Sequence, residues 1–337
     1  MQDLRGIHWG NFLWLDPFGL FPQKPSEKPG ISDSDLFESM IRRMRDFRPK
    51  SIKVIIHTYA GDQNQNSWLE VQARIIERLH QEFPGASIVL RLEGAPYADA
   101  NEQIGLAKAP LMARDFAPII NYITQRVQDD AGQPPIWLII ENEPNHPISV
   151  FYQRPAYFNQ WFKTVVWHFW NVYPILNKPG SLSHGLFYPG LSPNYDDVGW
   201  YNHPSTVEIL NYTIVDPFDN QTHLRQCWAN GIIFHCYWQT GHGQDPTWGG
   251  RYKLLWGVVA QYNPYFPVMI GEWGNSSNDD MDAVKTPEYK DWLSAIAVQS
   301  VIPNILATAL YILDSSDPQW SMFILTENAC REIGQWM

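Results

Sequence analysis

The fold is indicated by the stretch SIKVIIHTYAGDQNQNSWLEVQARIIERLHQEFPGASIVLRLEG, residues 51–94. Its two ends, Ile52–Thr58 and Ser87–Leu92, are short apolar runs of the kind that form buried strands. The segment between them, Ser67–Phe83, has apolar residues at helical spacing, at Leu69, Ala73, Ile76, Leu79 and Phe83. A strand, a helix and a second strand in this order indicate α/β architecture with parallel strands.

The same alternation continues along the whole chain. Further strands are predicted at Gly6–Trp9, Ile136–Asn142, Gly185–Pro189, Gly231–Tyr237, Val268–Glu272 and Leu306–Leu313. Further helices are predicted at Asp35–Phe47, Phe116–Val127, Ala156–Tyr173, Tyr252–Tyr262, Pro287–Gln299 and Thr326–Trp336, with one more near Asn220–Ala229. Eight strands with helices between them predict a closed (β/α)₈ TIM barrel, because an open sheet rarely needs so many. No linker or change of composition divides residues 1–337, so we expect one domain.

Open nucleotide-binding folds fit the sequence less well. A Rossmann domain requires G-x-G-x-x-G after its first strand, and Gly10-Asn11-Phe12 does not supply it. A P-loop is also missing. The net charge of −11 would repel a phosphate backbone, so we expect no nucleic-acid partner. Three cysteines are too few and too scattered for a disulfide framework or a zinc site.

No membrane partner and no secretion signal are expected from the sequence. No apolar run approaches the ~20 residues of a membrane span. The first residues, MQDLRGIHWGNFLWLDPF, lack the apolar region and the cleavage site of a signal peptide. The expected location is therefore the cytoplasm, unless the chain lacks its leader.

Two glutamates stand where a barrel of this kind carries out its chemistry. Active sites of these barrels lie at the C-terminal ends of the strands. The fourth strand runs WLIIENEPNHP and ends at Glu143, and the seventh runs PVMIGEWGN and ends at Glu272. These strands face each other across the barrel mouth. Hydrolysis of a glycosidic bond requires such a pair, one carboxyl to protonate the leaving oxygen and one to attack the anomeric carbon.

The order of these motifs resembles clan A of the (β/α)₈ retaining glycosidases, a group that includes cellulase-, mannanase- and xylosidase-like families. The resemblance implies that Glu143 is the acid/base, that Asn142 binds the sugar 2-OH and that Glu272 is the nucleophile. The sixth strand reads IIFHCYWQ, which matches the His-x-Tyr motif of the clan at His235 and Tyr237. Strand alternation predicts that both side chains point to the same face.

The sequence departs from the clan at two places. The second strand lacks the usual terminal arginine, and we expect Arg91 on the third strand to keep Glu272 ionised instead. The eighth strand lacks the usual terminal tryptophan, so Asp314, Trp320 or neither contributes there.

Several other residues have more than one expected role. His8 and Trp9 either line the first subsite or pack in the core. Trp238 and Trp248 are possible sugar platforms. Glu141 is expected to form a buried ion pair with Lys53 or Arg91, without a catalytic role.

The predicted activity is hydrolysis of a β-linked oligo- or polysaccharide by double displacement, without metal or organic cofactor. The β preference is implied by the resemblance alone. Three alternatives stay open: a transglycosylase with the same residues, a sugar-binding barrel without activity, and a metal-dependent hydrolase. The last would usually have His-x-His in its first strand, where this chain has only His8.

Two distances follow from these assignments. The carboxyl groups of Glu143 and Glu272 should lie about 5–5.5 Å apart if the enzyme retains configuration. The Tyr237 hydroxyl should reach Glu272 at about 2.6–3.2 Å.

Overall fold

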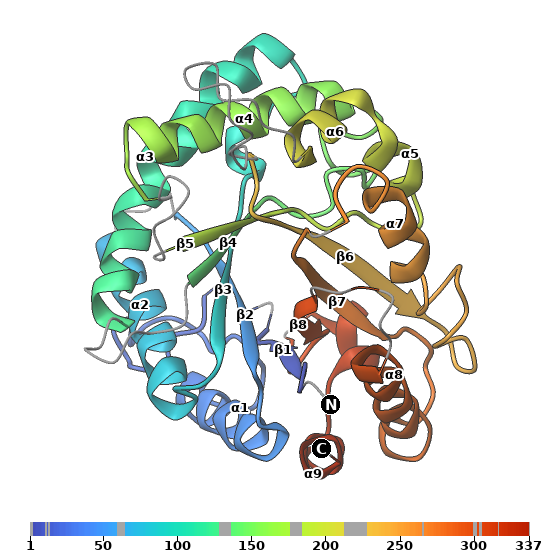
Figure 1. Ribbon diagram of the computed structural model, residues 1–337. Coiled ribbons are helices and arrows are strands. Elements are labelled where there is room, and N and C mark those ends of the chain that lie inside the picture. The colour runs from blue at the N-terminus through green and yellow to red at the C-terminus, as the bar shows by residue number, and fades with distance from the viewer. Residues whose placement is uncertain are drawn as a thin grey trace.

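The protein is a closed barrel of eight parallel strands that follow one another in chain order (Figure 1). A computed structural model describes residues 3–10, 12, 14–58, 65–127, 136–175, 184–211, 228–264, 266–298, 302, 305–315 and 317–336. The strands are β1 (Gly6–His8), β2 (Ser51–Ile56), β3 (Ser87–Leu92), β4 (Ile136–Ile140), β5 (His184–Tyr188), β6 (Gly231–Trp238), β7 (Val268–Asn275) and β8 (Ile305–Leu310). Each of the eight predicted strands is present.

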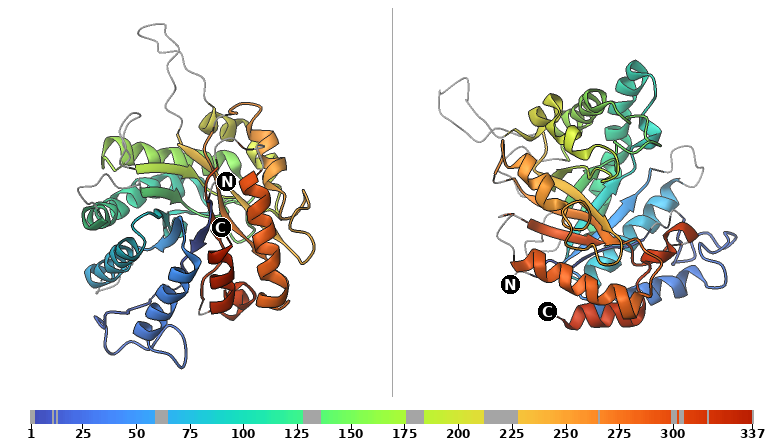
Figure 2. Two further views of the ribbon diagram at one scale, coloured as in Figure 1. Left: turned by 60° about the horizontal axis from the view of Figure 1, so that its bottom comes forward. Right: turned by 90° about the vertical axis from the view of Figure 1, so that its right-hand side faces the viewer.

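Helices surround the barrel on its outside (Figures 1 and 2). They are α1 (Asp33–Phe47), α2 (Gln65–Glu82), α3 (Glu102–Val127), α4 (Pro155–Asn171), α5 (Asp197–Asn202), α6 (Pro204–Leu210), α7 (Tyr252–Val259), α8 (Thr286–Val298) and α9 (Glu327–Gln335). Three short turns of helix, η1 (Ala95–Tyr97), η2 (Met281–Lys285) and η3 (Pro318–Phe323), lie in the connections. In the described ranges, no helix is both long and apolar enough to cross a membrane.

The helices form where the sequence supplies both an apolar face and a start signal. In α1 the Ser32 side chain accepts a hydrogen bond from the Asp35 amide and so caps the first turn. The apolar face of α1 is buried against the barrel through Leu36, Met40, Ile41, Met44 and Phe47. Helix α9 is capped in the same way by Thr326.

One predicted helix needs correction, and another lies mostly outside the described residues. Helix α3 begins at Glu102, well before the predicted Phe116, and its Pro110 is accommodated inside the helix. A proline removes only one helical hydrogen bond, and the burial of neighbours such as Met112 offsets that loss. The helix expected at Asn220–Ala229 falls mostly on residues 220–227, which lie outside the described residues. Two helices that the sequence did not predict, α5 and α6, follow β5, and the Asp196 side chain caps the first of them.

Strand alternation divides the barrel side chains into two sets. One buried cluster fills the barrel interior and consists of Val89, Ile139, Phe187, Ile233, Met269, Ala307 and Ala309. Their neighbours in sequence, such as Leu138 and Ile232, pack against the helices in the larger core. Because the period of a strand is two residues, the next inward position along each strand lies one layer nearer the C-terminal mouth. Those positions carry the polar groups described below.

Strand β7 breaks this alternation at Gly271. The pairing of β6 with β7 runs Phe234 with Ile270 and then His235 with Glu272, so Gly271 is an extra residue. A regular strand would point Glu272 outward, as it does Ile270. The bulge turns Glu272 inward, toward the barrel mouth. A side chain at Gly271 would meet Ile233, with its Cβ 2.3 Å from Cγ2.

Candidate active site

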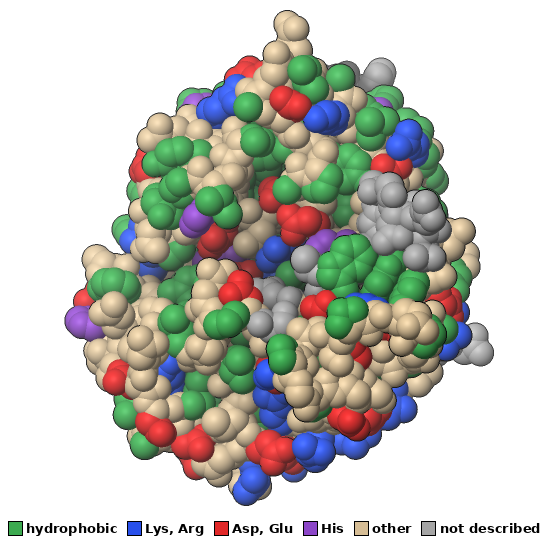
Figure 3. All heavy atoms as spheres, turned by 180° about the vertical axis from the view of Figure 1, so that it is seen from behind, with side chains coloured by type: hydrophobic (Ala, Val, Ile, Leu, Met, Phe, Trp, Pro, Cys, Tyr) green, Lys and Arg blue, Asp and Glu red, His purple; other side chains and the backbone are tan. Residues whose placement is uncertain are grey.

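A cleft of about 1200 Å³ opens at the C-terminal ends of the strands. Six carboxyl side chains are among its described lining residues, at Glu27, Glu93, Glu141, Glu143, Glu272 and Asp317. Arg91 is the single guanidinium among them. The face in Figure 3 is hollowed near its centre, and acidic side chains gather around the hollow. The cleft therefore favours a neutral or cationic ligand over an anionic one.

Glu143 is held at the cleft by an unusual backbone. Both Glu141 and Glu143 have left-handed conformations, with φ of 70° and 44°. The Glu143 amide donates to the Gly190 carbonyl, which follows β5, at 3.0 Å. Such conformations cost free energy for residues other than glycine and gather at functional sites. The Glu143 side chain remains partly exposed to the cleft.

Glu272 is buried among groups that favour its charged form. Lys53 Nζ lies 2.6 Å from Glu272 Oε1, and the Tyr237 hydroxyl donates to Oε2 at 2.5 Å. Arg91 Nη1 lies 3.7 Å from Oε1. Burial alone would raise the pKa of Glu272, but the neighbouring charges, Lys53 first, hold this pKa well below its usual range. Glu272 is therefore a carboxylate at neutral pH.

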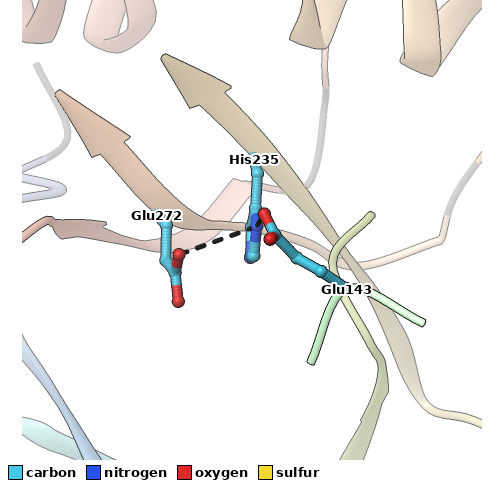
Figure 4. Close-up of side chains that lie close together, drawn as sticks. All are labelled: Glu143, His235 and Glu272. Carbon is cyan, nitrogen blue, oxygen red and sulfur yellow. Dashed lines mark hydrogen bonds and ion pairs between the residues drawn. The ribbon is translucent and has the colours of Figure 1, made fainter. Parts of the chain in front are cut away.

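His235 lies between the two glutamates (Figure 4). Its Nδ1 is 2.9 Å from Glu143 Oε1 and 3.8 Å from Glu272 Oε2. One oxygen of each glutamate and a ring nitrogen of His235 all lie within 4.8 Å of one another. The structure thus brings together two carboxyl groups with unequal surroundings, one ion-paired and buried, the other facing the cleft.

Several residues singled out from the sequence do meet here. Glu143, Glu272, Asn142, Arg91 and Tyr237 line the cleft, and His235 lies beneath them. The Tyr237 hydroxyl points to Glu272, as the alternation along β6 predicts. Trp248 and Trp320 also line the cleft.

The tryptophans Trp9 and Trp238 do not lie in the cleft. Trp9 points out of the barrel and packs edge-to-face on Phe37 of α1. Trp238 is fully buried and stacks on Trp292 of α8, so it offers no sugar platform. Both are outward positions of their strands, where the helices cover them.

The ion pair expected at Glu141 needs correction, and His8 has the second of its two expected positions, in the core. Lys53 pairs with Glu272, and within the described residues Glu141 has no ion pair. His8 is inward and fully buried, with its ring 5.2 Å from that of Tyr311, and it is not among the residues that line the cleft. Burial holds the pKa of His8 well below its usual value, so its ring is neutral.

Compared by sequence, the chain matches no family model and no curated protein. Solved structures are similar to it over nearly its whole length. A GH5_18 protein from Bifidobacterium longum subsp. infantis has a TM-score of 0.60 at 14% identity and covers 99% of this chain and 79% of its own. PbGH5A, a glycoside hydrolase family 5 enzyme from Prevotella bryantii B14, has a TM-score of 0.56 at 11% identity, covering 100% and 99%. Beta-glucosidase 2 from the fungus Trichoderma reesei has a TM-score of 0.55 at 12% identity, covering 99% and 93%.

The chain has the fold of these glycoside hydrolases. At such identities the likeness establishes the fold alone, and the chemistry must be argued from the site.

In this glycoside hydrolase fold, sequence reasoning gave Lys53 the wrong partner, Glu141 in place of Glu272, and missed Tyr311. Lys53 is an inward residue of β2, between the outward Ile52 and Val54, and this charge inside an apolar strand was the available signal. Tyr311 directly follows β8 and lines the cleft, at the strand end where the clan usually has a tryptophan. Its ring lies edge-on to Trp320, with the centroids 5.5 Å apart.

A glycine beneath His235 provides a first testable prediction. A Cβ on Gly190 would lie 2.2 Å from His235 Nε2, so Gly190→Ala must displace the imidazole. We expect the free energy of unfolding to fall by about 1–3 kcal/mol, which is typical of overpacking. Chemical denaturation measures it. Gly257→Ala is the matched control, because its Cβ would meet nothing within 4 Å in helix α7, and there stability should rise by about 0.5–1 kcal/mol. Equal effects of the two changes would contradict the prediction.

Proposed function

We propose that the chain is a retaining glycoside hydrolase that cleaves β-linked oligo- or polysaccharides, with Glu272 as nucleophile and Glu143 as acid/base. The observation that carries the proposal is the short separation of two carboxyl groups in unequal environments at the mouth of a (β/α)₈ barrel. One oxygen of Glu143 and one of Glu272 lie within 4.8 Å of each other, which is closer than the ~6.5–9.5 Å carboxyl separation of inverting enzymes and near the ~5–5.5 Å of retaining ones. The β preference follows the clan resemblance.

The surroundings of Glu272 suit attack on the anomeric carbon. A nucleophile must be ionised, and Lys53 keeps this carboxyl so despite its burial. The Tyr237 hydroxyl holds Oε2, and burial together with the charge of Glu272 raises the Tyr237 pKa well above its usual value. Tyr237 therefore stays a donor across the working pH range and fixes the orientation of the carboxylate.

The surroundings of Glu143 suit proton transfer. Glu143 faces the cleft, where the glycosidic oxygen would lie, and it has no lysine or arginine partner among the described residues. In the first step it protonates the leaving oxygen while Glu272 bonds to the anomeric carbon. In the second it takes a proton from water, which then displaces Glu272. His235, in contact with both carboxyl groups, positions Glu143 through Nδ1.

A metal-dependent reaction fits the same residues less well. Glu143, His235 and Glu272 have the spacing of a cation site. However, the Lys53 ammonium already contacts Glu272, and Arg91 is close by, so a metal ion would meet two fixed positive charges. Such repulsion weakens metal binding.

A mechanism-based inhibitor tests the proposal. 2-Deoxy-2-fluoro-β-glycosides with dinitrophenolate leaving groups should trap a covalent adduct, and peptide mass spectrometry should locate it on Glu272. Incubation with EDTA should leave the rate of trapping unchanged. An adduct on Glu143 would reverse the assigned roles. Failure of a broad panel of such glycosides to form any adduct would favour a sugar-binding protein instead.

A further inference from the structure

The cleft contains a second group of carboxyl side chains that the proposed mechanism does not use. Glu141 directly follows β4 and lines the cleft, yet only 8% of its surface is exposed. Its Oε1 accepts a hydrogen bond from the Asn142 amide at 3.2 Å. Its Oε2 is buried beside the Gly94 amide and makes no hydrogen bond of normal geometry among the described residues. A buried polar atom without a partner costs free energy, which a ligand in the cleft would recover.

The backbone around Glu141 is shaped to keep this carboxyl in place. Gly94, just after β3, lies so close that a Cβ there would be 2.4 Å from Glu141 Oε2. The left-handed conformation of Glu141 itself, with φ of 70°, directs the side chain. A residue whose backbone conformation costs free energy, and whose buried carboxyl oxygen could still accept a hydrogen bond, is typical of a ligand-binding position.

Charged neighbours surround Glu141 on the side of β2 and β3. Glu93 lines the cleft beside it and accepts a hydrogen bond from Arg91 at 3.2 Å. Arg91 also approaches Glu272, so a single guanidinium separates this second group from the nucleophile. His57, after β2, lines the same part of the cleft, and burial lowers its pKa to about 4, so its ring is neutral at pH 7. The positive charge of Arg91 is therefore already shared by two carboxylates.

These surroundings determine whether the Glu141 carboxyl carries a proton at neutral pH. Burial first, and the negative charge of Glu93 second, raise the pKa of Glu141 to about 8. At neutral pH the Glu141 carboxyl is therefore mostly protonated, and it can donate one hydrogen bond as well as accept one. Glu93, which is ion-paired with Arg91, can only accept. A donor beside an acceptor matches a sugar hydroxyl pair, in which one oxygen accepts and the next O–H donates.

We infer that Glu141 and Glu93 form a second carboxyl pair that binds two hydroxyl groups of a neutral sugar next to the catalytic pair. The inference deepens the proposed function by naming the substrate class at the same cleft. Glu141 donates to one hydroxyl oxygen, and Glu93 accepts from the other. A uronic acid is excluded by the surrounding carboxylates. A cationic amino sugar would require Glu141 to lose its proton.

Binding measurements test this subsite without any need for turnover. Isothermal titration calorimetry would use the full chain with Glu143→Gln, so that a bound disaccharide is not cleaved, and cellobiose, mannobiose and laminaribiose as neutral probes. Glu141→Leu, which removes the donor, should weaken the best of the three by about 10–100-fold. Glu141→Gln keeps a donor and should bind within about threefold of its parent. Glu38→Gln, a change on the exposed side of α1, is the control and should have no effect.

The pH dependence gives a second readout with a definite sign. The donor on Glu141 is present below its pKa of about 8 and is lost above it. Affinity of the parent for the neutral probe should therefore be about tenfold weaker at pH 9 than at pH 7. The Glu141→Gln variant should show no such loss. Burial also lowers the pKa of Lys53, but both proteins contain Lys53. Any effect of its titration would therefore appear in the parent and in Glu141→Gln alike.

Several outcomes would overturn the inference. One is an unchanged affinity in Glu141→Leu, with circular dichroism showing that the variant is folded. Another is tighter binding of the glucosamine disaccharide than of its neutral counterpart, with affinity rising toward pH 8, which would mean that the subsite is anionic and selects a cationic sugar. Failure of all three neutral disaccharides to bind would also overturn it. Because none of these depends on hydrolysis, they are distinguishable from a failure of the trapping experiment.

Discussion

Glu272→Ala should abolish turnover of every glycoside, whatever its leaving group, because attack on the anomeric carbon is lost. Glu143→Ala should instead act selectively. Substrates with poor leaving groups need protonation and should slow by about 10²–10⁴-fold, whereas activated aryl glycosides should retain their first step. Steady-state rates on a series of aryl glycosides with leaving groups of graded acidity measure the difference.

Added azide separates the two roles further. A small anion can attack the glycosyl-enzyme without general-base help, so azide should accelerate the second step of Glu143→Ala and yield the β-glycosyl azide. It should not restore a two-step reaction in Glu272→Ala. Glu102→Gln, an exposed glutamate paired with Arg154, is a control for loss of a carboxylate elsewhere on the surface. A leaving-group dependence that followed Glu272 would mean that the assignments are reversed.

Lys53→Met is the second change with a large expected effect. Of the lysine and arginine side chains that the structure describes near Glu272, this change leaves Arg91, at 3.7 Å. Burial then raises the Glu272 pKa, so the acidic limb of the kcat/KM profile should move up by about 1–3 pH units. The sign follows from the mechanism, since activity requires the carboxylate and disappears as pH falls through its pKa. The pH profile of an activated aryl glycoside measures the shift.

Stability provides an independent check on Lys53. Removal of one partner from a buried ion pair costs about 3–5 kcal/mol, so the free energy of unfolding should also fall. Lys53→Arg keeps the charge and should keep the acidic limb near its original position. Lys290→Met breaks a solvent-accessible pair with Glu332 and should change stability far less than Lys53→Met does. An unmoved acidic limb in folded Lys53→Met would show that Lys53 does not control Glu272.

Much of the barrel could be predicted from the sequence because its signals are local. A buried strand is a short apolar run, and a covering helix repeats its apolar residues about every 3.6 positions. The β2–α2–β3 unit shows both signals within residues 51–94. Where the local signal is interrupted, as at Pro110 in α3, the predicted boundary was wrong, since tertiary burial decides whether a proline is tolerated.

The ends of the strands were predictable for a related reason. In a closed parallel barrel, all the C-terminal ends lie at one mouth, so a glutamate that ends a strand must lie there. This places Glu143 and Glu272 on opposite sides of one cleft without knowledge of any contact. The alternation within β6 likewise puts His235 and Tyr237 on the same face.

The partners of these groups depended on the tertiary structure. Lys53, Arg91 and Glu141 come from three neighbouring strands, and the sequence allowed Lys53 to pair with Glu141. The bulge at Gly271 turns Glu272 inward beside His235, which brings the Lys53 ammonium to Glu272, and in the described part of the chain Glu141 has no ion-pair partner.

By itself, then, the sequence determined the barrel and the mouth at which both glutamates lie, because strand period and strand ends are local properties. The tertiary structure alone decided which charge neutralises the nucleophile and which carboxyl keeps its proton. Those outcomes depend on a one-residue change of register between strands and on burial, and neither can be predicted from the local sequence around each residue.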